Sequence, residues 1–407
     1  MGDRYDAVVV GASAAGCTAA HLLGRAGARV ALVERRPDAD AYKVVCTHAI
    51  LSSGAPTIAR LGLEPALEAR GAVRIHGDGW TPFGGWIRAP DDAPTGWGVT
   101  RSTLDPLLRG HAADTPGVEL LLGHTATGLL AGAAGRPAGV EVETRDHDRR
   151  SLRAPLVVAA DGRHSPLARM AGVRGRVKPN NRFAYWAYWR GIPPTDRARV
   201  WLLEPDGAAH FPNEDGLTLL AAVGHRSRLP EFRTDLDGAY LRYVRALPDG
   251  PVLDGAERIS KVVGAIDHQN VIRPAARPGI AFVGDAALAA DPLFGVGLSW
   301  ALQSGEWLAD AVAPALLGDG ELDAALKRYA RRFARRLAPH HLVISDFSSG
   351  RPSTPVERVM SRAAAGNRRV ARAFDDAFSR RHSPLRLLDP RLAPHVVRGL
   401  VTRGPGA

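Results

Sequence analysis

Hydrophobic and polar positions in the first forty residues follow a strand–helix–strand order. Residues 5–10 read YDAVVV, a valine-rich run that predicts a buried strand. Residues 17–23 form a small-residue, apolar segment of helical type, and a second apolar run at 29–33 ends in Glu34. Strand, glycine turn, helix, strand and acid stand in the order that a dinucleotide-binding βαβ unit needs.

The turn after the first strand carries the residues that would meet a nucleotide. Gly11 lets the chain turn sharply out of the strand, and Gly16 lets the helix pack closely on the sheet. Ser13 replaces the middle glycine of the usual pattern. The helix start directs free N–H groups toward a pyrophosphate, and Glu34 stands where a carboxylate accepts hydrogen bonds from a ribose 2′-hydroxyl. The alternative is a glycine turn in an unrelated α/β protein.

The remaining pattern predicts an α/β part that an antiparallel sheet interrupts. A helix begins near Ser102, and apolar strands follow at 118–122, 126–130, 140–144 and 153–160. Between 175 and 275, short aromatic and aliphatic runs broken by turns predict an antiparallel sheet. The pattern then predicts a strand at 279–283 and helices at 298–317, 321–337 and 355–380.

From this pattern we predict an α/β fold in three parts. The first is a Rossmann-like domain with a mostly parallel sheet, made of residues 1–70, 100–174 and 276–340. The second is a substrate-binding domain built on an antiparallel sheet, made of residues 71–99 and 175–275. The third is a C-terminal helical region, residues 341–407.

Composition and charge narrow the class of protein. The 407 residues are 45% hydrophobic and 23% charged, which fits a globular protein with a large core. No apolar run is long enough to span a membrane and no signal-peptide core begins the chain, so we expect a cytoplasmic protein. Zinc-site spacings, a P-loop and nucleic-acid motifs are absent from the sequence, and we expect neither a metal nor a nucleic-acid partner.

The basic charge belongs to one end of the chain. Residues 321–407 hold 18 Lys and Arg and 7 Asp and Glu. The difference of +11 equals the net charge of the whole chain. The basic helix at 321–337 could contact a membrane surface or an acidic carrier protein. A solvated outer face is the commoner reason for such a run.

Three motifs stand in one order along the chain: GASAAG at 11–16 with Glu34, AADGRHS at 159–165, and VGDAALAADPLFGVG at 283–297. Together they resemble the FAD-dependent monooxygenases of the aromatic-hydroxylase type and their relatives, the geranylgeranyl reductases and flavin-dependent halogenases. The resemblance covers roughly the whole chain. It implies that the dinucleotide is FAD and that the Rossmann-like part is an FAD-binding domain.

The resemblance also implies roles for individual residues. Arg101 matches an arginine that reaches FAD phosphates, and Asp161 with Gly162 matches a motif said to touch FAD and a nicotinamide donor. Asp285 matches an aspartate that binds the ribityl chain; its place after a strand and a glycine supports this, and an N-cap is the alternative. The predicted cofactor-binding residues are Gly11, Ser13, Ala14, Ala15, Gly16, Glu34, Arg35, Lys43, Arg101, Asp161, Gly162, Gly284, Asp285, Pro292, Gly295, Val296, Gly297 and Leu298.

The function that we expect is an FAD-dependent, NAD(P)H-consuming monooxygenase. It would hydroxylate or epoxidise an aromatic or unsaturated small molecule through a flavin C4a-hydroperoxide. No second Gly-x-Gly-x-x-Gly is present, so NAD(P)H would be a transient electron donor. In many hydroxylases the last motif continues with Asn and later Asp, but here Ser299 and Ser304 stand at those positions. In this respect the motif is more like that of the reductase and halogenase branches.

Other functions remain open at this point. The alternative is a flavin-dependent double-bond reductase similar to geranylgeranyl reductases. A halogenase is disfavoured because residues 188–193 do not meet its Trp-x-Trp-x-Ile-Pro motif. A flavin-binding protein with a non-redox role is a further alternative.

Substrate contacts are expected on the aromatic strand at 183–191. One face of this strand should meet the flavin and could stack on an aromatic, polyketide or terpenoid substrate. Cys46 and His48 are either reactive groups near the flavin or packing residues, and Lys43 is either a phosphate ligand or solvated. No catalytic residue is assigned. The candidate substrate-binding residues are Tyr185, Trp186, Tyr188, Arg190 and His210.

Overall fold

The glycine turn of the N-terminal unit stands at the carboxyl edge of a six-stranded sheet in the computed structural model, which describes residues 3–401. Five of its strands run parallel, and β21 at one edge runs antiparallel to β22. β2 and β3 are buried along their whole length, as their valine-rich sequences predict. In spatial order the strands are β21 (Ala276–Arg277), β22 (Ile280–Phe282), β12 (Leu156–Ala159), β2 (Ala7–Val10), β3 (Val30–Glu34) and β8 (Val118–Leu122).

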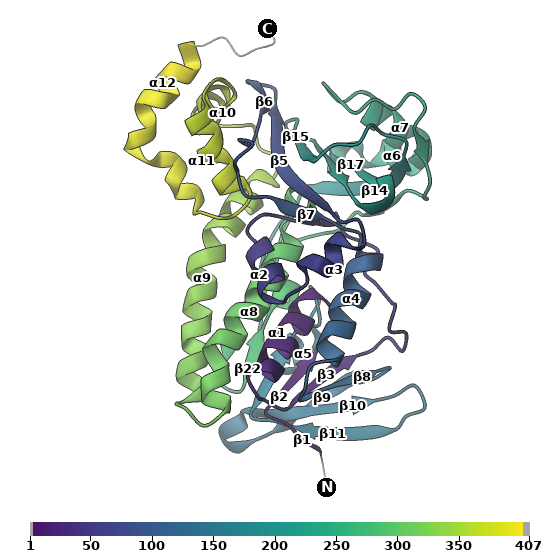
Figure 1. Ribbon diagram of the computed structural model, residues 1–407, viewed down its shortest axis with the longest axis vertical. Helices are drawn as coiled ribbons and strands as arrows, with labels where there is room; N and C mark the ends of the chain where they lie inside the picture. Colours follow the sequence, from purple (N-terminus) through teal and green to yellow (C-terminus); the bar gives the residue numbers. More distant parts are fainter. Residues whose placement is uncertain (1–2, 402–407) are drawn as a thin grey trace.

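Long helices pack beside this sheet and beside each other (Figure 1). They are α1 (Ala14–Arg25), α4 (Arg101–Ala113), α8 (Gly297–Leu316) and α9 (Leu322–Phe347). Gly305 allows α8 to approach α1 closely, because a Cβ atom there would lie 2.5 Å from the carbonyl oxygen of Ala15. α9 continues ten residues beyond the predicted end at 337 and passes through Pro339.

Two smaller sheets complete the lower part of the molecule. The hairpin predicted at 126–130 and 140–144 is confirmed as the antiparallel pair β9 and β10, and β10 contacts β2 and β12. The four-stranded sheet contains β1 (Asp3–Arg4), β11 (Arg149–Arg153), β10 (Pro137–Glu143) and β9 (Thr125–Ala131). The three-stranded sheet contains β13 (Arg176–Lys178), β20 (Asn270–Ile272) and β23 (Leu288–Ala289).

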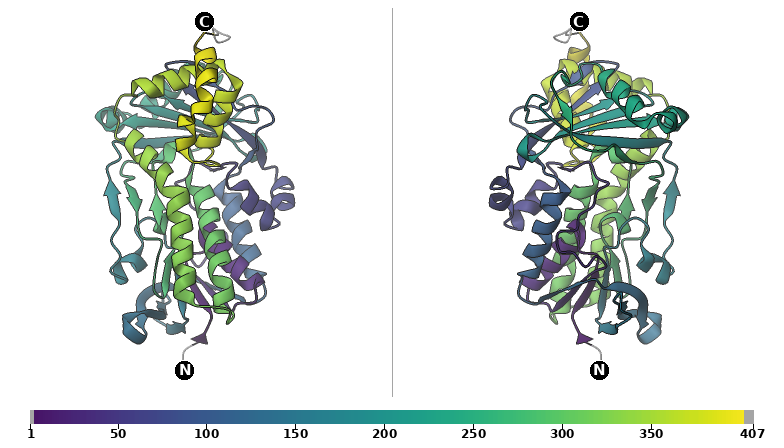
Figure 2. Two further views of the ribbon diagram at one scale, coloured as in Figure 1. Left: turned by 90° about the vertical axis from the view of Figure 1, so that its left-hand side faces the viewer. Right: turned by 90° about the vertical axis from the view of Figure 1, so that its right-hand side faces the viewer.

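A ten-stranded sheet lies across the upper part of the molecule (Figure 2). It is mixed rather than purely antiparallel, because β5 and β15 pair in parallel. Its main path contains β18 (Glu257–Arg258), β14 (Arg182–Arg190), β17 (Thr218–His225), β16 (Gly207–Pro212), β15 (Arg197–Leu202), β5 (Val73–Thr81), β7 (Gly96–Gly98) and β4 (Ala49–Ile50). β19 (Val263–Ala265) pairs with β14, and β6 (Gly85–Ile87) pairs with β5.

The C-terminal residues form a helical lobe beside β5 and β6 (Figure 1). The single helix predicted at 355–380 is wrong, since the chain breaks at Asn367, whose side chain caps the second helix by accepting from two backbone N–H groups. The elements of this lobe are α10 (Pro355–Gly366), α11 (Arg368–Phe378), η6 (Pro384–Leu388), η7 (Pro390–Leu392) and α12 (Ala393–Val401).

Short helices fill the connections between the sheets. They are α2 (Ala55–Arg60), α3 (Glu64–Glu68), α5 (Pro166–Met170), α6 (Leu229–Thr234) and α7 (Leu236–Arg245), with 3-10 turns η1 (Ala133–Gly135), η2 (Glu214–Gly216), η3 (Arg226–Arg228), η4 (Gly284–Ala286) and η5 (Pro292–Phe294). Among residues 3–401, none of these or the longer helices combines the length and apolar content of a membrane span. The same residues contain no group of three His, Cys, Asp or Glu side chains arranged to hold a metal.

The α/β fold with a mostly parallel nucleotide-binding sheet, a second large sheet and C-terminal helices agrees with the fold class predicted from the sequence. The three-part division stays a prediction. Two elements cross its boundaries: α9 runs through residue 340, and β4 brings residues 49–50 of the first segment into the large sheet.

Candidate functional site

The glycine turn leaves no room for side chains. Gly11 has φ +109°, and a Cβ atom there would lie 2.3 Å from the carbonyl oxygen of Ala160. A Cβ on Gly16 would lie 1.9 Å from the carbonyl oxygen of Gly11. Both positions therefore require glycine, and they bring the start of α1, with Ala14 and Ala15, close to the ends of β2 and β12. This backbone approach is what a bound pyrophosphate needs.

Glu34 is fixed at the end of β3, beside the same turn. Its Oε2 accepts a hydrogen bond from the backbone N–H of Ala12 at 3.0 Å, and its Oε1 accepts from the N–H of Arg36 at 3.1 Å. The side chain is buried, but each carboxylate oxygen can accept a further hydrogen bond. This geometry fits the binding of a ribose. Arg35, the residue after Glu34, is exposed.

Arg101 reaches the glycine turn from the first residue of α4. Its Nη2 donates to Oγ of Ser13 at 2.7 Å, and its Nε and Nη2 both donate to the Asp105 carboxylate at 2.8 Å. The side chain is 3% exposed, and Asp105 compensates its charge. Arg101 therefore holds Ser13 in place beside the position expected for FAD phosphates.

Sequence reasoning missed two further residues of the same helix, Asp105 and Arg109. Asp105 also accepts from the backbone N–H of Lys43, and Arg109 donates to the carbonyl oxygens of Ala12, Ala39 and Ala41. Arg–Asp–Arg at intervals of four residues along one helix face is the signal that could have found them.

Asp285 lies inside η4, after β22, and Val283 rather than Asp285 is the N-cap of that turn. Its Oδ2 lies 3.0 Å from Nζ of Lys43, with side chains 24% and 43% exposed. Burial by itself would raise the pKa of the Asp285 carboxyl, but the nearby Lys43 ammonium holds that pKa below its usual range. Asp285 is therefore ionised and can accept hydrogen bonds from ribityl hydroxyls, with Lys43 as its neighbour.

The predicted flavin-lining turn joins η5 to α8. Gly295 adopts a left-handed conformation with φ +62°, and α8 begins at Gly297. A Cβ on Gly295 would lie 3.3 Å from the Phe211 ring and 3.7 Å from Oγ1 of Thr47. Gly297 is exposed, and the N–H groups at this start of α8 can stabilise negative charge on a bound ring. Pro292 is half-buried, and Val296 and Leu298 are buried.

Two polar anchors hold the turns η4 and η5 in place. The backbone N–H of Gly284 donates to Oγ of Ser304 at 2.8 Å. The buried Asp291 carboxylate accepts from the N–H of Leu293 at 2.9 Å and lies 3.3 Å from the Arg182 guanidinium.

The Asp161 carboxylate is used within the protein. It accepts from Oγ of Ser165 at 2.6 Å and from the backbone N–H of Leu167 at 2.9 Å, at the start of α5. Burial raises its pKa despite these hydrogen bonds. Gly162 follows with φ +83°. The contact of Asp161 with FAD and a nicotinamide stays a prediction.

The large sheet separates the five candidate substrate residues between its two faces. Trp186 and Tyr188 face the nucleotide-binding part and pack with its core, whereas Tyr185 faces α6 and stacks on Phe232 at 5.6 Å. His210 alternates with Ala209 and Phe211 along β16 and so lies on the face opposite to them. Its burial lowers the pKa of the imidazole to about 4. Arg190 is exposed at the end of β14.

Cys46, His48 and Tyr188 form a polar cluster with Arg101. The Sγ of Cys46 lies 3.7 Å from Nη1 of Arg101 and accepts from the N–H of His48 at 3.4 Å. His48 Nδ1 accepts from the backbone N–H of Arg101 at 2.8 Å, and its Nε2 lies 2.7 Å from the Tyr188 hydroxyl. Burial lowers the pKa of His48 to about 3, so the ring is neutral.

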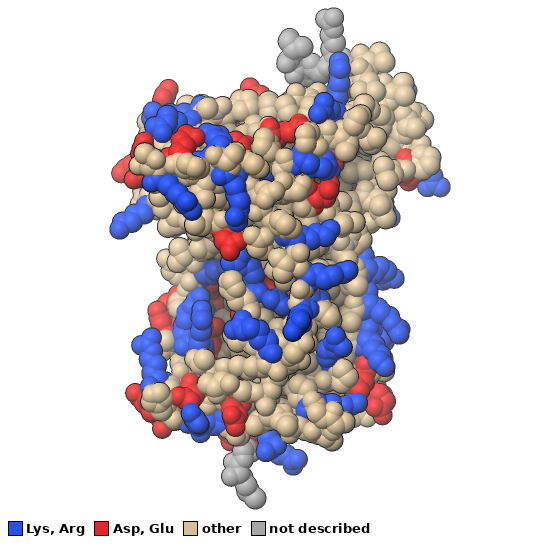
Figure 3. All heavy atoms as spheres, turned by 180° about the vertical axis from the view of Figure 1, so that it is seen from behind, with Lys and Arg blue, Asp and Glu red and all other residues tan. Residues whose placement is uncertain are grey.

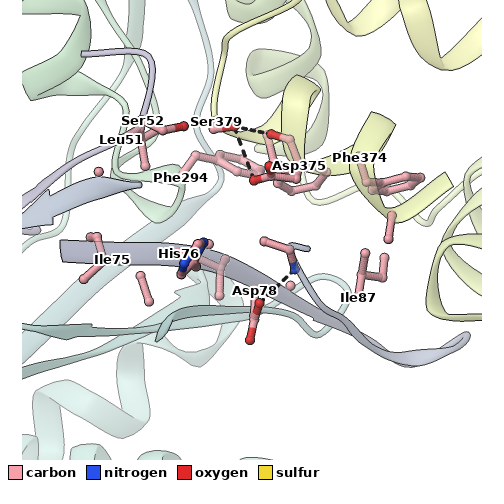
Figure 4. A pocket seen from close by; sticks show the side chains of 18 of the residues that line it. Leu51, Ser52, Ile75, His76, Asp78, Ile87, Phe294, Phe374, Asp375 and Ser379 are labelled. Atoms are coloured by element: carbon pink, nitrogen blue, oxygen red, sulfur yellow. Dashed lines mark hydrogen bonds between the residues drawn. The ribbon is translucent and has the colours of Figure 1, made fainter. Parts of the chain in front are cut away.

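An apolar cavity of about 80 Å³ lies between the large sheet and α11. Figure 4 shows β5 with Ile75, His76 and Asp78 on one side, and Phe294, Phe374 and Asp375 on the other. Phe211 and Phe294 join it to the turn at Gly295. Its large apolar lining residues are Leu51, Ile75, Ile87, Val200, Leu202, Phe211, Phe294, Phe374 and Phe378.

The wall that α11 contributes was missed by sequence reasoning. Phe374 and Phe378 stand four residues apart, which is the spacing of one apolar face, on a helix that also carries three arginines and two aspartates. That pattern is visible in the sequence, but only the fold shows that this face covers the cavity.

Comparison with known proteins agrees with this geometry. The family described as "FAD binding domain" matches residues 4–188. Digeranylgeranylglycerophospholipid reductase 2 of Methanopyrus kandleri is 30% identical over 343 residues, which cover 81% of this chain and 82% of that protein. The chain belongs to the family of FAD-binding flavoproteins that includes this reductase. It is an FAD-dependent oxidoreductase.

Solved structures share the fold. A geranylgeranyl bacteriochlorophyll reductase-like protein of Thermoplasma acidophilum superposes with TM-score 0.73 at 19% identity, covering 97% of this chain and 99% of that one. PqsL of Pseudomonas aeruginosa, described as a probable FAD-dependent monooxygenase, has TM-score 0.70 at 21% identity and covers 92% and 99%. At these identities the likeness shows the fold alone, and it does not separate reduction from oxygenation.

Proposed function

We propose that the protein reduces carbon–carbon double bonds in an apolar, unsaturated substrate such as an isoprenoid chain. One relative of this chain is named as a reductase, and this favours double-bond reduction over the monooxygenase activity that the sequence motifs lead us to expect. The apolar cavity beside the turn at Gly295 supports a substrate of this class, because its walls offer aliphatic and aromatic side chains. Oxygenation stays a prediction without a specific observation in its favour.

The observation that carries the proposal is the position of Cys46. Lys43 pairs with Asp285 and Thr47 lies beside Gly295, so the segment between them crosses the position expected for the flavin. Cys46 is partly exposed there, with the Arg101 guanidinium and the His48 N–H on its sulfur. A thiol that gives up a proton at this place leaves a thiolate that both groups stabilise.

Saturation of a double bond needs two hydrogens of different origin. When bound, FAD would be held by the turn at Gly11 and by Glu34 and Asp285, and in its reduced form it would supply the hydride for one carbon. The Cys46 thiol gives its proton to the other carbon, so that the π bond breaks and two C–H bonds form; the thiolate then regains a proton from water. NAD(P)H, bound transiently, would return the two electrons to the flavin.

His48 and Tyr188 hold Cys46 in position. Because Nδ1 of His48 accepts from the Arg101 N–H, its proton lies on Nε2 and donates to the Tyr188 oxygen. Burial raises the pKa of Tyr188 well above its usual range, which keeps the phenol neutral and makes it a poor proton donor. The pair therefore fixes the segment that carries the thiol.

Anaerobic turnover tests the proposal. The FAD-loaded enzyme, reduced with dithionite, is mixed without oxygen with an isoprenoid alcohol of geranylgeranyl length, and the products are analysed by mass spectrometry. The expected product carries two additional hydrogens for each bond reduced. A parallel incubation with NAD(P)H and ¹⁸O₂ is the control. Products that contain ¹⁸O, together with no saturated product under anaerobic conditions, would overturn the proposal in favour of a monooxygenase.

A further inference from the structure

The C-terminal lobe, residues 355–401, exposes apolar side chains that its own core does not use. Six of the seventeen large exposed hydrophobic residues of the described chain lie on it. Leu385 and Leu388 of η6 are 67% and 66% exposed, and Val401 of α12 is 78% exposed. The others are Val356, Val359 and Val397.

These side chains alternate with residues that do form the lobe's core. Leu387 lies between the two exposed leucines of η6 and packs inward, as do Val396 and Leu400 beside the exposed valines of α12. The core that they join contains Ile87 of β6 and Phe374 of α11. The outward residues are therefore surplus to the packing of the lobe, and exposed leucines and valines at this density indicate a contact surface.

Arginine is the commonest charged residue of the same lobe. Residues 355–401 contain ten arginines and four acidic residues. Arg362, Arg386 and Arg391 are exposed, and within residues 3–401 none of the three has an ion pair. Figure 3 shows this lobe at the upper right as a broad uncharged surface with separate basic side chains. The complement of such a surface is apolar and negatively charged.

The lobe is also the wall of the cavity. Phe374, Phe378 and Ala371 of α11 line the cavity on one side of the lobe, while η6 and α12 pack on α11 from elsewhere in the lobe. Whatever binds to the exposed residues therefore lies one layer of helices away from the apolar space. A bilayer fits this arrangement, because it would bring a high concentration of apolar chains close to the apolar cavity.

We propose that the C-terminal lobe docks on the surface of an anionic lipid bilayer, with Leu385, Leu388, Val397 and Val401 entering the interface and Arg386 and Arg391 contacting lipid headgroups. The predicted basic helix at 321–337 is not this surface: its residues Leu326, Tyr329 and Phe333 are buried against the nucleotide-binding part. The choice of a bilayer rests on the proposed apolar substrate, but vesicle binding and double-bond reduction are measured separately, so the failure of one can be told from the failure of the other.

Vesicle co-sedimentation of the full-length, FAD-loaded protein tests the surface. Vesicles of mixed phosphatidylglycerol and phosphatidylcholine should bind the protein, vesicles of phosphatidylcholine alone should bind it more weakly, and added salt should lower the binding to the anionic vesicles. The double variant Leu385→Glu/Leu388→Glu should lose at least about tenfold in affinity, and Arg386→Glu/Arg391→Glu should behave in the same way.

The matched control is Val252→Glu, which places the same charge at a valine that is 60% exposed outside the lobe. It should bind vesicles as the wild type does. All variants should keep their FAD content and circular dichroism spectrum, which excludes misfolding. Equal binding of the leucine variant and the wild type, or no binding to anionic vesicles, would overturn the proposal. A wild-type dimer in light scattering that Leu385→Glu converts to a monomer would assign the surface to a second copy instead.

Discussion

The Lys43 ammonium lies 3.0 Å from the Asp285 carboxylate, across 242 residues of sequence. This ion pair joins the loop that carries Cys46 to the turn η4 that is predicted to hold the ribityl chain. Since Asp105 accepts from the backbone N–H of the same lysine at 3.0 Å, the loop is fixed at both its backbone and its side chain. Binding of FAD at Asp285 therefore requires the ribityl hydroxyls to share this carboxylate with Lys43.

We predict that Asp285→Asn weakens FAD binding by about tenfold, because a hydrogen bond to a charged group is worth roughly 1.5–3 kcal/mol and the amide keeps only part of it. Fluorescence titration of the apoprotein with FAD measures the change. The melting temperature without FAD should alter little, since the Asp285 side chain is no helix cap whose loss would destabilise the fold. A wild-type Kd for the variant would remove Asp285 from the cofactor site.

Glu34→Ala should affect both FAD affinity and stability. The carboxylate accepts from two backbone N–H groups, of Ala12 and Arg36, and truncation leaves them without this acceptor beside the glycine turn. We expect a loss of about 1.5–3 kcal/mol in FAD binding and a lower melting temperature of the apoprotein. Glu34→Gln, which retains one acceptor oxygen, should lie between the wild type and Glu34→Ala in both measurements. If only the melting temperature changes, Glu34 holds the turn but does not contact the ribose.

Local patterns were sufficient for the parts of the fold that local physics determines. The strand–turn–helix at Gly11 and the hairpin of β9 and β10 follow from glycine geometry and apolar alternation over short stretches. Alternation also shows that Tyr185 and Tyr188 lie on opposite faces of β14. It does not show which face meets the flavin, because that depends on where α6 and α7 pack.

The site itself depends on contacts between distant segments. Arg101 meets Cys46 across 55 residues, and Lys43 meets Asp285 across 242. No periodicity links such pairs, so Lys43 could be predicted as a phosphate ligand but not as the partner of Asp285. In the same way, the apolar spacing of Phe374 and Phe378 predicts a buried face without showing that a cavity lies beneath it.

Cys46→Ala should separate electron transfer from proton transfer. Its FAD content and the rate of flavin reduction by NAD(P)H should match those of the wild type, while double-bond reduction should slow by about a hundredfold or more, the usual effect of losing a general acid. Cys46→Ser, which retains a proton but a weaker acid, should recover part of the rate. Stopped-flow absorbance of the flavin, with and without substrate, measures both steps.

The matched control for this prediction is Cys17→Ala. Cys17 is buried on α1, and burial raises the pKa of its thiol to about 12, so it takes no part in proton transfer near neutral pH. Tyr188→Phe should have an intermediate effect through the loop position. Normal double-bond reduction by Cys46→Ala would show that the proton comes from another group.

Acid should destabilise the protein below about pH 6.5. Burial lowers the pKa of six histidines: that of His268, that of His21, His210 and His341 to about 4, and that of His48 and His340 to about 3. Between those values and 6.5 the unfolded chain binds more protons than the folded protein, so the free energy of unfolding falls as the pH falls. Each fully buried histidine contributes up to about 1.4 kcal/mol per pH unit.

Denaturant titrations at several pH values between 7 and 5 measure this slope. His210→Leu removes one buried titrating group and should flatten the slope by about one histidine's contribution. His147→Leu is the control, because that side chain is 84% exposed. A stability that does not depend on pH across this window would mean that these rings are protonated as readily in the folded protein as in the unfolded chain.

Val200→Phe should reduce the space available to a long substrate. Val200 lies on β15, lines the cavity and is only partly buried, so a larger side chain can enter the empty volume without displacing the core. We therefore expect a stability loss below about 1.5 kcal/mol, less than the usual cost of overpacking. The KM for an isoprenoid of geranylgeranyl length should rise about tenfold, while the KM for a truncated substrate and the rate of NAD(P)H-driven flavin reduction should be unaffected.

Trp201 is the matched control position, because it is the next residue of the same strand but is fully buried on the α7 side of the sheet. Trp201→Phe should lower the melting temperature without changing the KM ratio of long to short substrates. A ratio that Val200→Phe leaves unchanged would show that the substrate chain does not enter this cavity.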